Sequence, residues 1–266
     1  MRIALIGHGK MGSALLTQWS NVAERDFPDH SFFVIHPSAD ADRDTAQVRF
    51  LPAPPPADQS AFDLLIVAVK PQMVDSVLPD YVPHLAEGGF VASIAAGCSI
   101  ARLRRLSGGA PVVRVMPNLP AAIGAGVSGL CADPSVNAQQ REAIEALMAA
   151  AGLTVWVDDE DKLDRLTAVA GSGPGYVFEI ARTYVAAAEA LGFSAPEARQ
   201  LVLGTMAGTL AMAQSSGQGL DTLRTSVTSK AGTTAAGLDA LNGDEGLSAR
   251  MLATVNAAYR RAIELR

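Results

Sequence analysis

The chain opens on a short apolar run that leads directly into a glycine-rich turn and then into a helical pattern. The run is Ile3 to Ile6, the turn reads Gly-His-Gly-Lys-Met-Gly over residues 7–12, and residues 13–19 have helical character. A strand, a G-x-G-x-x-G turn and a helix in this order are typical of folds that hold a dinucleotide pyrophosphate at the helix start. We favour a cofactor site over a glycine-rich turn that binds nothing.

Further buried-strand patterns follow the opening unit. They lie at residues 31–35, 62–69, 90–95, 111–116, 127–130 and 154–157, and helical patterns such as 137–151 separate several of them. Strands that alternate with helices predict parallel βαβ units. Residues 1–158 are therefore predicted to form a dinucleotide-binding Rossmann domain, an α/β fold with a doubly wound, mainly parallel sheet. Four prolines within residues 52–56 predict a loop.

The second half of the chain changes character. Asp158 to Asp161 has the composition of an acidic connector, and no strand pattern follows it. Residues 159–266 are predicted to form an all-helical domain, with helices at 174–191, 196–215, 220–227, 234–241 and 246–264. Leu201 to Met212 is apolar almost all the way round, so this helix must be buried. A small domain has little interior, and we expect a homodimer or a higher homo-oligomer.

Composition narrows the choice of partners and compartment. The 21 Lys and Arg residues are outnumbered by 27 Asp and Glu, and no basic run reaches five residues, so a nucleic-acid partner is not expected. Cys98 and Cys131 lie far apart without metal-like spacing. We therefore expect no metal site and a reducing, cytoplasmic location. No apolar run is long enough for a signal peptide or a membrane span.

Candidate cofactor residues gather where the predicted strands end. An NAD enzyme usually carries an acid after the second strand, but here no acid occurs between Ile35 and Asp40. His36, Ser38 and Arg43 would suit a 2′-phosphate, although they also read as ordinary loop residues. We favour NADPH and keep NADH possible. The predicted cofactor contacts are Gly7, His8, Gly9, Lys10, Met11, Gly12, His36, Ser38, Ala68, Val69, Lys70, Pro71, Ala95, Ala96 and Gly97.

Two polar, glycine-bearing turns interrupt the helices of the second half. One is Gly171-Ser172-Gly173-Pro174-Gly175, and the other is Ser229-Lys230-Ala231-Gly232-Thr233-Thr234. Each precedes a helix, and free backbone N–H groups at a helix start bind a carboxylate well. Ser and Thr also cap helices routinely, which is the alternative interpretation. We favour a substrate carboxylate.

These motifs resemble, in order and along almost the whole chain, the pyrroline-5-carboxylate reductase family. The matching pieces are the glycine turn, residues 68–72, 93–97, 115–118, 171–174 and 232–234. The resemblance implies a Rossmann domain followed by a helical dimerisation domain, and reduction of 1-pyrroline-5-carboxylate, a cyclic imine, to L-proline in proline biosynthesis. It further implies a substrate site that contains Glu160, Ser172, Gly173, Thr233, Thr234, Met116 and Asn118, with Thr234 as the catalytic contact to the ring nitrogen.

The chain departs from the family pattern at three places. The family usually has Pro-Gly where Lys230-Ala231 stand, Thr in place of Leu119, and Asp-Asn in place of Thr225-Ser226. Ala231 restricts backbone freedom that glycine would give. Lys230 adds a positive charge beside the expected carboxylate site.

The predicted mechanism follows from what the two polar turns lack. Neither contains His, Asp or Glu. A ketone reductase needs a proton donor, whereas a cyclic imine can arrive already protonated and then needs positioning. Three alternatives remain at this point: another imine reductase, a β-hydroxyacid dehydrogenase, and a nucleotide-sensing protein without catalysis. The dehydrogenases use a lysine soon after a glycine turn in the helical domain, and residues 175–180 contain none.

Overall fold

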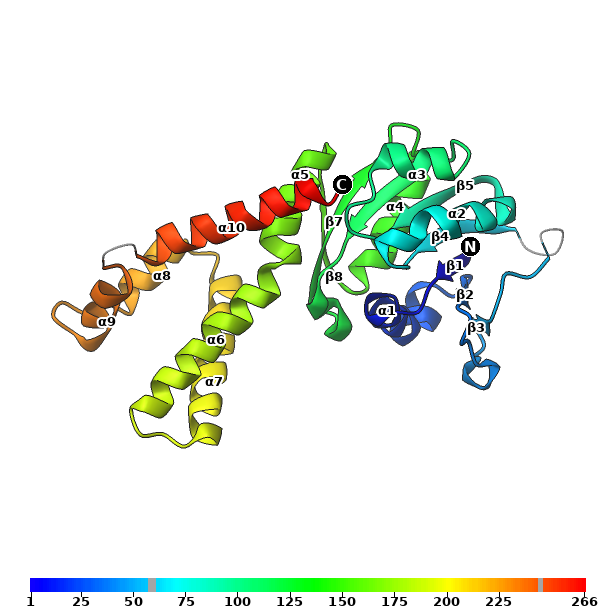
Figure 1. Cartoon of the computed structure of the whole chain (residues 1–266). Helices are drawn as coiled ribbons and strands as arrows, with labels where there is room; N and C mark the ends of the chain where they lie inside the picture. The colour runs from blue at the N-terminus through cyan, green and yellow to red at the C-terminus, as the bar shows by residue number, and fades with distance from the viewer. Residues whose placement is uncertain (57–60, 244–245) are drawn as a thin grey trace. The chain divides into compact units, whose positions relative to one another are not determined.

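The opening apolar run forms the strand β1 (Arg2–Ile6) in the interior of a sheet. Ile3 to Ile6 are all buried, because helices cover both faces of the sheet. The structure is a computed structural model that describes residues 1–56, 61–243 and 246–266. It contains two compact units, one of residues 1–174 with 258–266 and one of residues 175–257 (Figure 1).

The sheet of the first unit has eight strands in the order β3-β2-β1-β4-β5-β6-β7-β8. The order reverses beside β1, which makes the sheet doubly wound and creates the crevice where such folds bind ligands. The fold-class prediction is confirmed. The remaining strands are β2 (Ser31–Ile35), β3 (Val48–Leu51), β4 (Phe62–Val67), β5 (Leu85–Ser93), β6 (Val112–Met116), β7 (Gly126–Ala132) and β8 (Gly152–Trp156).

Two features of the sheet differ from the sequence prediction. The strand β7 pairs antiparallel with β6. Only residues 117–125 link these strands, with the short 3₁₀ helix η5 (Leu119–Ile123), and a parallel crossover needs a dozen or more residues. The edge strand β3 was not predicted. It has only four residues, and exposed Arg49 lies between buried Val48 and Phe50.

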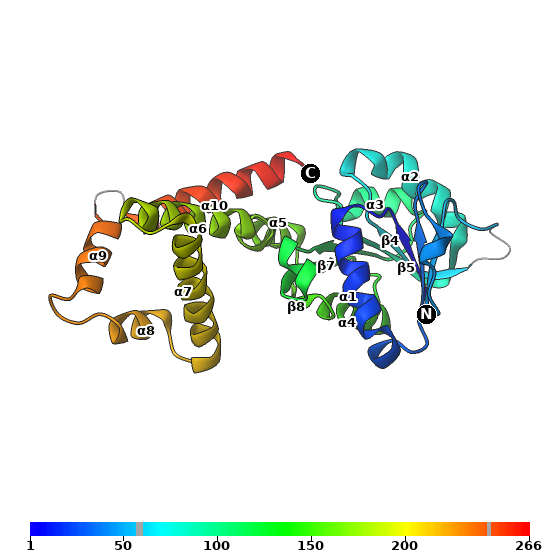
Figure 2. The same cartoon turned by 90° about the horizontal axis from the view of Figure 1, so that it is seen from below.

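Helices pack on both faces of the sheet, as Figure 2 shows from below. On one face lie α1 (Lys10–Asp26) and α4 (Ala138–Ala149), and Trp19 Nε1 of α1 donates to the Leu147 carbonyl of α4 at 2.8 Å. On the other face lie α2 (Val74–Tyr81) and α3 (Ile100–Leu106). The aliphatic core thus holds the carboxyl ends of the strands in place.

The acidic stretch at 158–161 is not a connector, which corrects the prediction. Glu160 begins the helix α5 (Glu160–Leu166). The Asp159 side chain caps this helix by accepting from the Lys162 N–H at 2.7 Å. Glu160 and Asp161 lie in its first turn, where negative charge is stabilised by the helix dipole. Asp residues before a helix are capping signals, so the stretch begins an element rather than linking two.

The predicted helices of the second half are present. They are α6 (Gly173–Ala190), α7 (Ala195–Ser216), α8 (Leu220–Ser226), α9 (Thr233–Leu241) and α10 (Leu247–Glu264). The second unit buries little of its own surface. Among its described residues only Ala181, Ala188, Ala198 and Val202 are buried, and the last three form a cluster near the turn that joins α6 to α7.

Candidate active site

The glycine turn after β1 has the geometry that the sequence motif requires. Gly7 has a φ of +97°, and a Cβ at this position would lie 2.9 Å from the Ala68 carbonyl oxygen. A Cβ at Gly12 would lie 3.0 Å from the Gly7 carbonyl oxygen, so α1 packs closely on the turn. Space around Gly9 is open, and Gly9 precedes α1 without a side-chain cap. The backbone N–H groups of the first turn of α1 therefore fit a pyrophosphate.

A cavity of about 320 Å³ lies at the carboxyl ends of β1, β2 and β4. Seven of the predicted cofactor residues line it: Gly7, His8, Gly9, His36, Ala68, Val69 and Lys70. Lys10, Met11 and Gly12 follow in the first turn of α1, and Pro71 begins the 3₁₀ helix η3 (Pro71–Met73). Seven predicted residues from these three strand ends thus line one cavity of a size that suits part of a dinucleotide, whereas Ser38 is not among the lining residues.

Basic and aromatic side chains gather at the β2 end of this cavity. The Arg43 guanidinium lies 4.5 Å from the centre of the Phe50 ring, and the His8 ring lies 5.6 Å from the same centre. His36 Nδ1 accepts from the Ser38 N–H at 3.1 Å. Burial, Arg43 and His36 together lower the pKa of His8. Sequence reasoning missed Phe50, because its strand was not recognised.

Two acidic residues of this region, Asp40 and Asp44, are engaged in local structure. The Asp40 side chain accepts from the Asp42 N–H at 3.1 Å. The Asp44 side chain accepts from the Phe50 N–H at 2.8 Å and from Arg49 at 3.1 Å. These two carboxylates hold the turn after β2 together.

The loop between β5 and α3 holds the predicted residues Ala95, Ala96 and Gly97. Ser93 Oγ at the strand end accepts from the Ala95 N–H at 3.3 Å. Gly97 has a φ of +72°, and a Cβ there would overlap the Leu265 carbonyl oxygen. The structure thus shows a local demand for glycine at this position. Contact of the loop with a nicotinamide stays a prediction.

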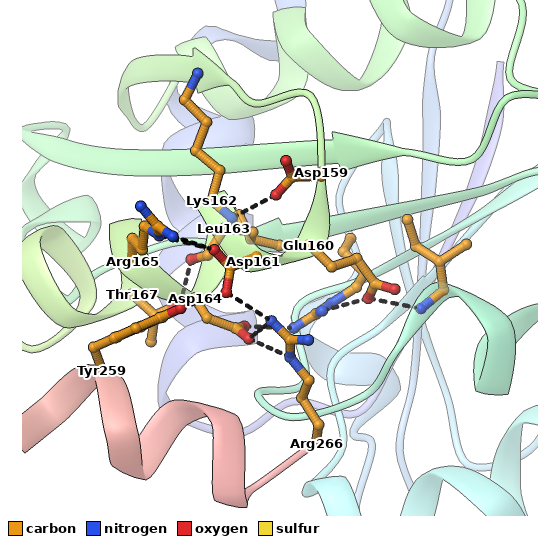
Figure 3. Close-up of polar contacts among 12 residues, drawn as sticks. Asp159, Glu160, Asp161, Lys162, Leu163, Asp164, Arg165, Thr167, Tyr259 and Arg266 are labelled. Atoms are coloured by element: carbon orange, nitrogen blue, oxygen red, sulfur yellow. Dashed lines mark hydrogen bonds and ion pairs between the residues drawn. The ribbon is translucent and has the colours of Figure 1, made fainter.

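Glu160 meets a buried arginine that sequence reasoning did not assign. Arg114 of β6 is 5% exposed, and its Nη1 lies 2.5 Å from Glu160 Oε1. The same Glu160 oxygen accepts from the Ile100 N–H at 2.9 Å, at the start of α3. Figure 3 shows Glu160 with these contacts. An arginine inside the apolar run Val112–Met116 was the available signal, since a buried cation needs a carboxylate partner.

Asn118, Met116 and Ser172 lie where the end of β6 meets the residues that follow α5. The Asn118 amide donates to the Ala170 carbonyl at 3.0 Å and accepts from the Val127 N–H at 2.8 Å. The Met116 methyl lies 3.2 Å from where a Cβ at Gly171 would stand. Asn118 therefore holds this corner together, and contact of these side chains with substrate stays a prediction.

The first polar turn is not a free helix start, which corrects the expectation for residues 171–175. Thr167–Gly171 form the π-helix η6, which follows α5 directly. The Ser172 N–H donates to the Thr167 carbonyl at 2.8 Å. This N–H is therefore not available to a ligand, because it continues the helical hydrogen bonding. The Ser172 side chain and Gly173 remain candidates.

The second polar turn lies in the other unit and does present an uncapped helix start. Gly232 precedes α9 without a side-chain cap, and Thr233 and Thr234 are the first two helical residues. Neither threonine hydroxyl forms a hydrogen bond with another described residue. The alternative that Thr234 is the cap is wrong, since Gly232 occupies that position. Ala231 has a φ of 58°, and among the described residues it alone has a positive φ without being glycine.

Comparison with known proteins gives one consistent picture. The family model described as pyrroline-5-carboxylate reductase dimerisation matches residues 160–265, and the model described as NADP oxidoreductase, coenzyme F420-dependent, matches residues 2–97. The chain is 32% identical over 268 residues to a pyrroline-5-carboxylate reductase of Synechocystis sp., covering 100% of this chain and 98% of that protein. It is 40% identical over 204 residues to one of Pseudomonas aeruginosa, covering 76% and 74%.

The chain belongs to the pyrroline-5-carboxylate reductase family.

Solved structures of the pyrroline-5-carboxylate reductase family share the fold. The structure of the Coxiella burnetii protein matches with a TM-score of 0.89 at 30% identity, covering 99% of this chain and 97% of that one. The Plasmodium falciparum protein with NADP bound matches with a TM-score of 0.83 at 26% identity, covering 100% and 98%. The predicted family and the predicted fold are therefore confirmed.

Membership of the pyrroline-5-carboxylate reductase family makes this chain an oxidoreductase with a nicotinamide cofactor and a small-molecule substrate. The match of residues 160–265 to a dimerisation model supports a homo-oligomer. Over residues 1–56, 61–243 and 246–266, every helix is too short or too polar to cross a lipid bilayer.

Proposed function

We propose that this protein reduces 1-pyrroline-5-carboxylate to L-proline with NADPH. The observation that carries the proposal is the glycine turn, which opens onto a cavity at the switch point of the sheet in a member of this family. The match to relatives named pyrroline-5-carboxylate reductase over the full chain supports the substrate.

The chain's own residues bind and orient in the proposed mechanism. NADPH, when bound, supplies a hydride for the imine carbon. The nitrogen of a protonated imine already holds its proton, so the product amine forms without a protein acid. The uncapped start of α9 would take the substrate carboxylate, and the Thr234 hydroxyl would hydrogen-bond the ring nitrogen. Glu160, Ser172, Gly173, Met116 and Asn118, all in the first unit, are the other residues that we propose for substrate binding.

The preference for NADPH is proposed from the charge at the β2 end of the cavity. Arg43 offers a cationic group and His8 and His36 offer imidazole rings, whereas the Asp40 and Asp44 side chains accept from backbone N–H groups. A 2′-phosphate is stabilised by such a setting, and a carboxylate that would hold a free 2′-hydroxyl is lacking after β2. The Plasmodium falciparum relative carried NADP in its structure.

We further propose that residues 1–158 form the cofactor domain and that residues 159–266 supply substrate binding and dimerisation. The dimerisation model begins at residue 160, which supports this functional boundary. Cytoplasmic location is proposed from the two buried free cysteines, which suit a reducing compartment.

The decisive experiment is an assay of purified protein for oxidation of NADPH in the presence of 1-pyrroline-5-carboxylate. Turnover with this substrate, and none with a β-hydroxyacid and NADP⁺, is the expected result. Folded protein that binds NADPH without turnover would indicate a sensing protein instead. Turnover with the β-hydroxyacid alone would assign the chain to the rival reaction.

A further inference from the structure

Arg114 is a buried cation that faces two carboxylates. Its Nη1 lies 2.5 Å from Glu160 Oε1, and its Nη2 lies 3.6 Å from Asp164 Oδ1. Asp164 is 3% exposed. One guanidinium leaves this pair of carboxylates with a net negative charge, and a buried carboxylate without full compensation is strongly destabilising. A second cation is required at this place in the fold.

Arg266, which follows α10, provides that second cation. Its Nε donates to Asp164 Oδ2, and its Nη2 lies 3.8 Å from Asp161 Oδ1. The Tyr259 hydroxyl of α10 donates to the same oxygen, Asp161 Oδ1. Figure 3 shows Arg266 and Tyr259 pointing at Asp164 and Asp161 of α5. The last turns of α10 are thereby anchored on α5.

The same anchored segment lies against the loop between β5 and α3. The Leu265 carbonyl oxygen occupies the space where a Cβ at Gly97 would stand. At the other end of the loop, the Ile100 N–H donates to Glu160 at 2.9 Å. The loop that contains Ala95, Ala96 and Gly97 is therefore bounded by Glu160 on one side and by residues 265–266 on the other.

We propose that Arg266 is a positioning residue that holds this loop in the conformation that binds the nicotinamide cofactor. It acts through Asp164 and through its neighbour Leu265, and it touches no reacting atom. A loop that is already ordered loses less conformational freedom when the cofactor binds, so affinity is higher. The inference rests on the proposed cofactor role of residues 95–97.

The test compares the dissociation constant of NADPH in the wild-type protein with that in Arg266→Ala, followed by cofactor fluorescence. We expect Arg266→Ala to weaken NADPH binding by about three- to tenfold and to raise the KM for NADPH more than it lowers kcat. Arg266→Lys keeps the charge and should restore most of the affinity. Arg261→Ala is the matched control, because within the described residues Arg261 of α10 forms an ion pair only with exposed Glu264, at 2.8 Å.

A second variant distinguishes the loss of loop positioning from the effect of leaving the Asp164 carboxylate without its cation. Arg266→Ala combined with Asp164→Asn removes the cation and its buried carboxylate together, and weak NADPH binding should persist in this folded protein. A lower melting temperature with an unchanged dissociation constant in Arg266→Ala would overturn the inference. Absence of NADPH binding by the wild-type protein would overturn the proposed function itself, and the inference with it.

Discussion

At the scale of single residues, Gly7 and Ala231 show how backbone conformation constrains residue choice. Gly7 has a φ of +97° and is a glycine, as the turn requires. Ala231 has a φ of 58° and carries a Cβ, at a position where the family usually has glycine. The left-handed region costs a residue with a Cβ about 1–2 kcal/mol. The turn before α9 therefore holds strain that the turn after β1 avoids.

Ala231→Gly is expected to stabilise the protein by about 0.5–1 kcal/mol, because relief of the left-handed strain exceeds the added freedom of the unfolded chain. Chemical denaturation measures the change. The control is Ala236→Gly within α9, where glycine should destabilise the helix by about 1 kcal/mol. Equal destabilisation by both substitutions would show that the turn is not strained.

Thr234→Ala is expected to lower kcat/KM by about two- to tenfold, which corresponds to loss of one hydrogen bond of about 0.5–1.5 kcal/mol. The melting temperature should stay near the wild-type value, since Gly232 and not Thr234 precedes the helix. Thr254→Ala in α10 is the control. Within the described residues, the Thr254 hydroxyl donates only to the Arg250 carbonyl of the same helix, at 2.8 Å. A fall in melting temperature with unchanged kinetics would remove Thr234 from the active site.

At the scale of elements, β2 and β3 help to position the side chains that we propose to distinguish NADPH from NADH. Phe50 of β3 supports both Arg43 and His8, at 4.5 Å and 5.6 Å from its ring centre. The Ser38 N–H donates to Nδ1 of His36, which follows β2, at 3.1 Å. A strand of four residues at the sheet edge thus helps to place the groups that we propose to bind a 2′-phosphate.

Ser38→Asp is expected to shift preference from NADPH toward NADH. A carboxylate there would repel the 2′-phosphate and could accept from a free 2′-hydroxyl. We expect the ratio of kcat/KM values for NADPH and NADH to fall by about tenfold or more. Ser38→Asn is the control without charge and should change the ratio less. An equal shift in both variants would assign the effect to loop structure instead.

The pH dependence of NADP⁺ binding should reveal whether the His8 ring becomes protonated when the cofactor binds. Burial, Arg43 and His36 lower its pKa in the free protein, whereas a bound phosphate favours the protonated ring. Binding would therefore take up a proton, and NADP⁺ should bind more tightly as pH falls from about 8 to about 6. At the lower pH we expect wild type to exceed His8→Asn in affinity by about two- to fivefold. NAD⁺, which keeps the pyrophosphate but lacks the 2′-phosphate, serves as the control. A constant ratio between the two proteins across this range would contradict the assignment.

At the scale of the whole molecule, the unit of residues 175–257 cannot be stable on its own packing. Its described buried residues are three alanines and Val202. Large apolar side chains remain exposed along its helices, with Phe178 at 62%, Leu210 at 56% and Leu252 at 65%. Exposed apolar side chains in this number are typical of a protein interface. The match to a dimerisation model assigns that interface to a second copy of the chain.

Leu210→Glu in α7 is expected to convert the oligomer into monomers with little activity. Burying an uncompensated carboxylate in an apolar interface costs about 3 kcal/mol or more, a hundredfold or greater rise in the dimer dissociation constant. Sedimentation at micromolar concentration reports the mass. Leu153→Glu on β8, at a side chain that is 64% exposed in the first unit, is the control and should leave the oligomer intact. Wild-type mass and activity in Leu210→Glu would place the interface elsewhere.

The sequence by itself determined the features that depend on near neighbours. The strand, glycine turn and helix at residues 2–12 follow from apolar runs and from steric demands at Gly7 and Gly12, and the five helices after residue 172 follow from their periodicity. Such patterns act over a few residues, so they can be read without the fold.

Only the tertiary structure decided the features that join distant residues. The link 117–125 turned β7 antiparallel, and pairing with β2 created the edge strand β3. Arg114 and Glu160 are 46 positions apart, and Arg266 and Asp164 are 102 positions apart. A buried charge shows in the sequence that it needs a partner, but the partner's identity depends on which strand and helix ends meet in three dimensions. That is why Glu160 was predicted from resemblance, while the arginines that hold it and its neighbours in place emerged only from the fold.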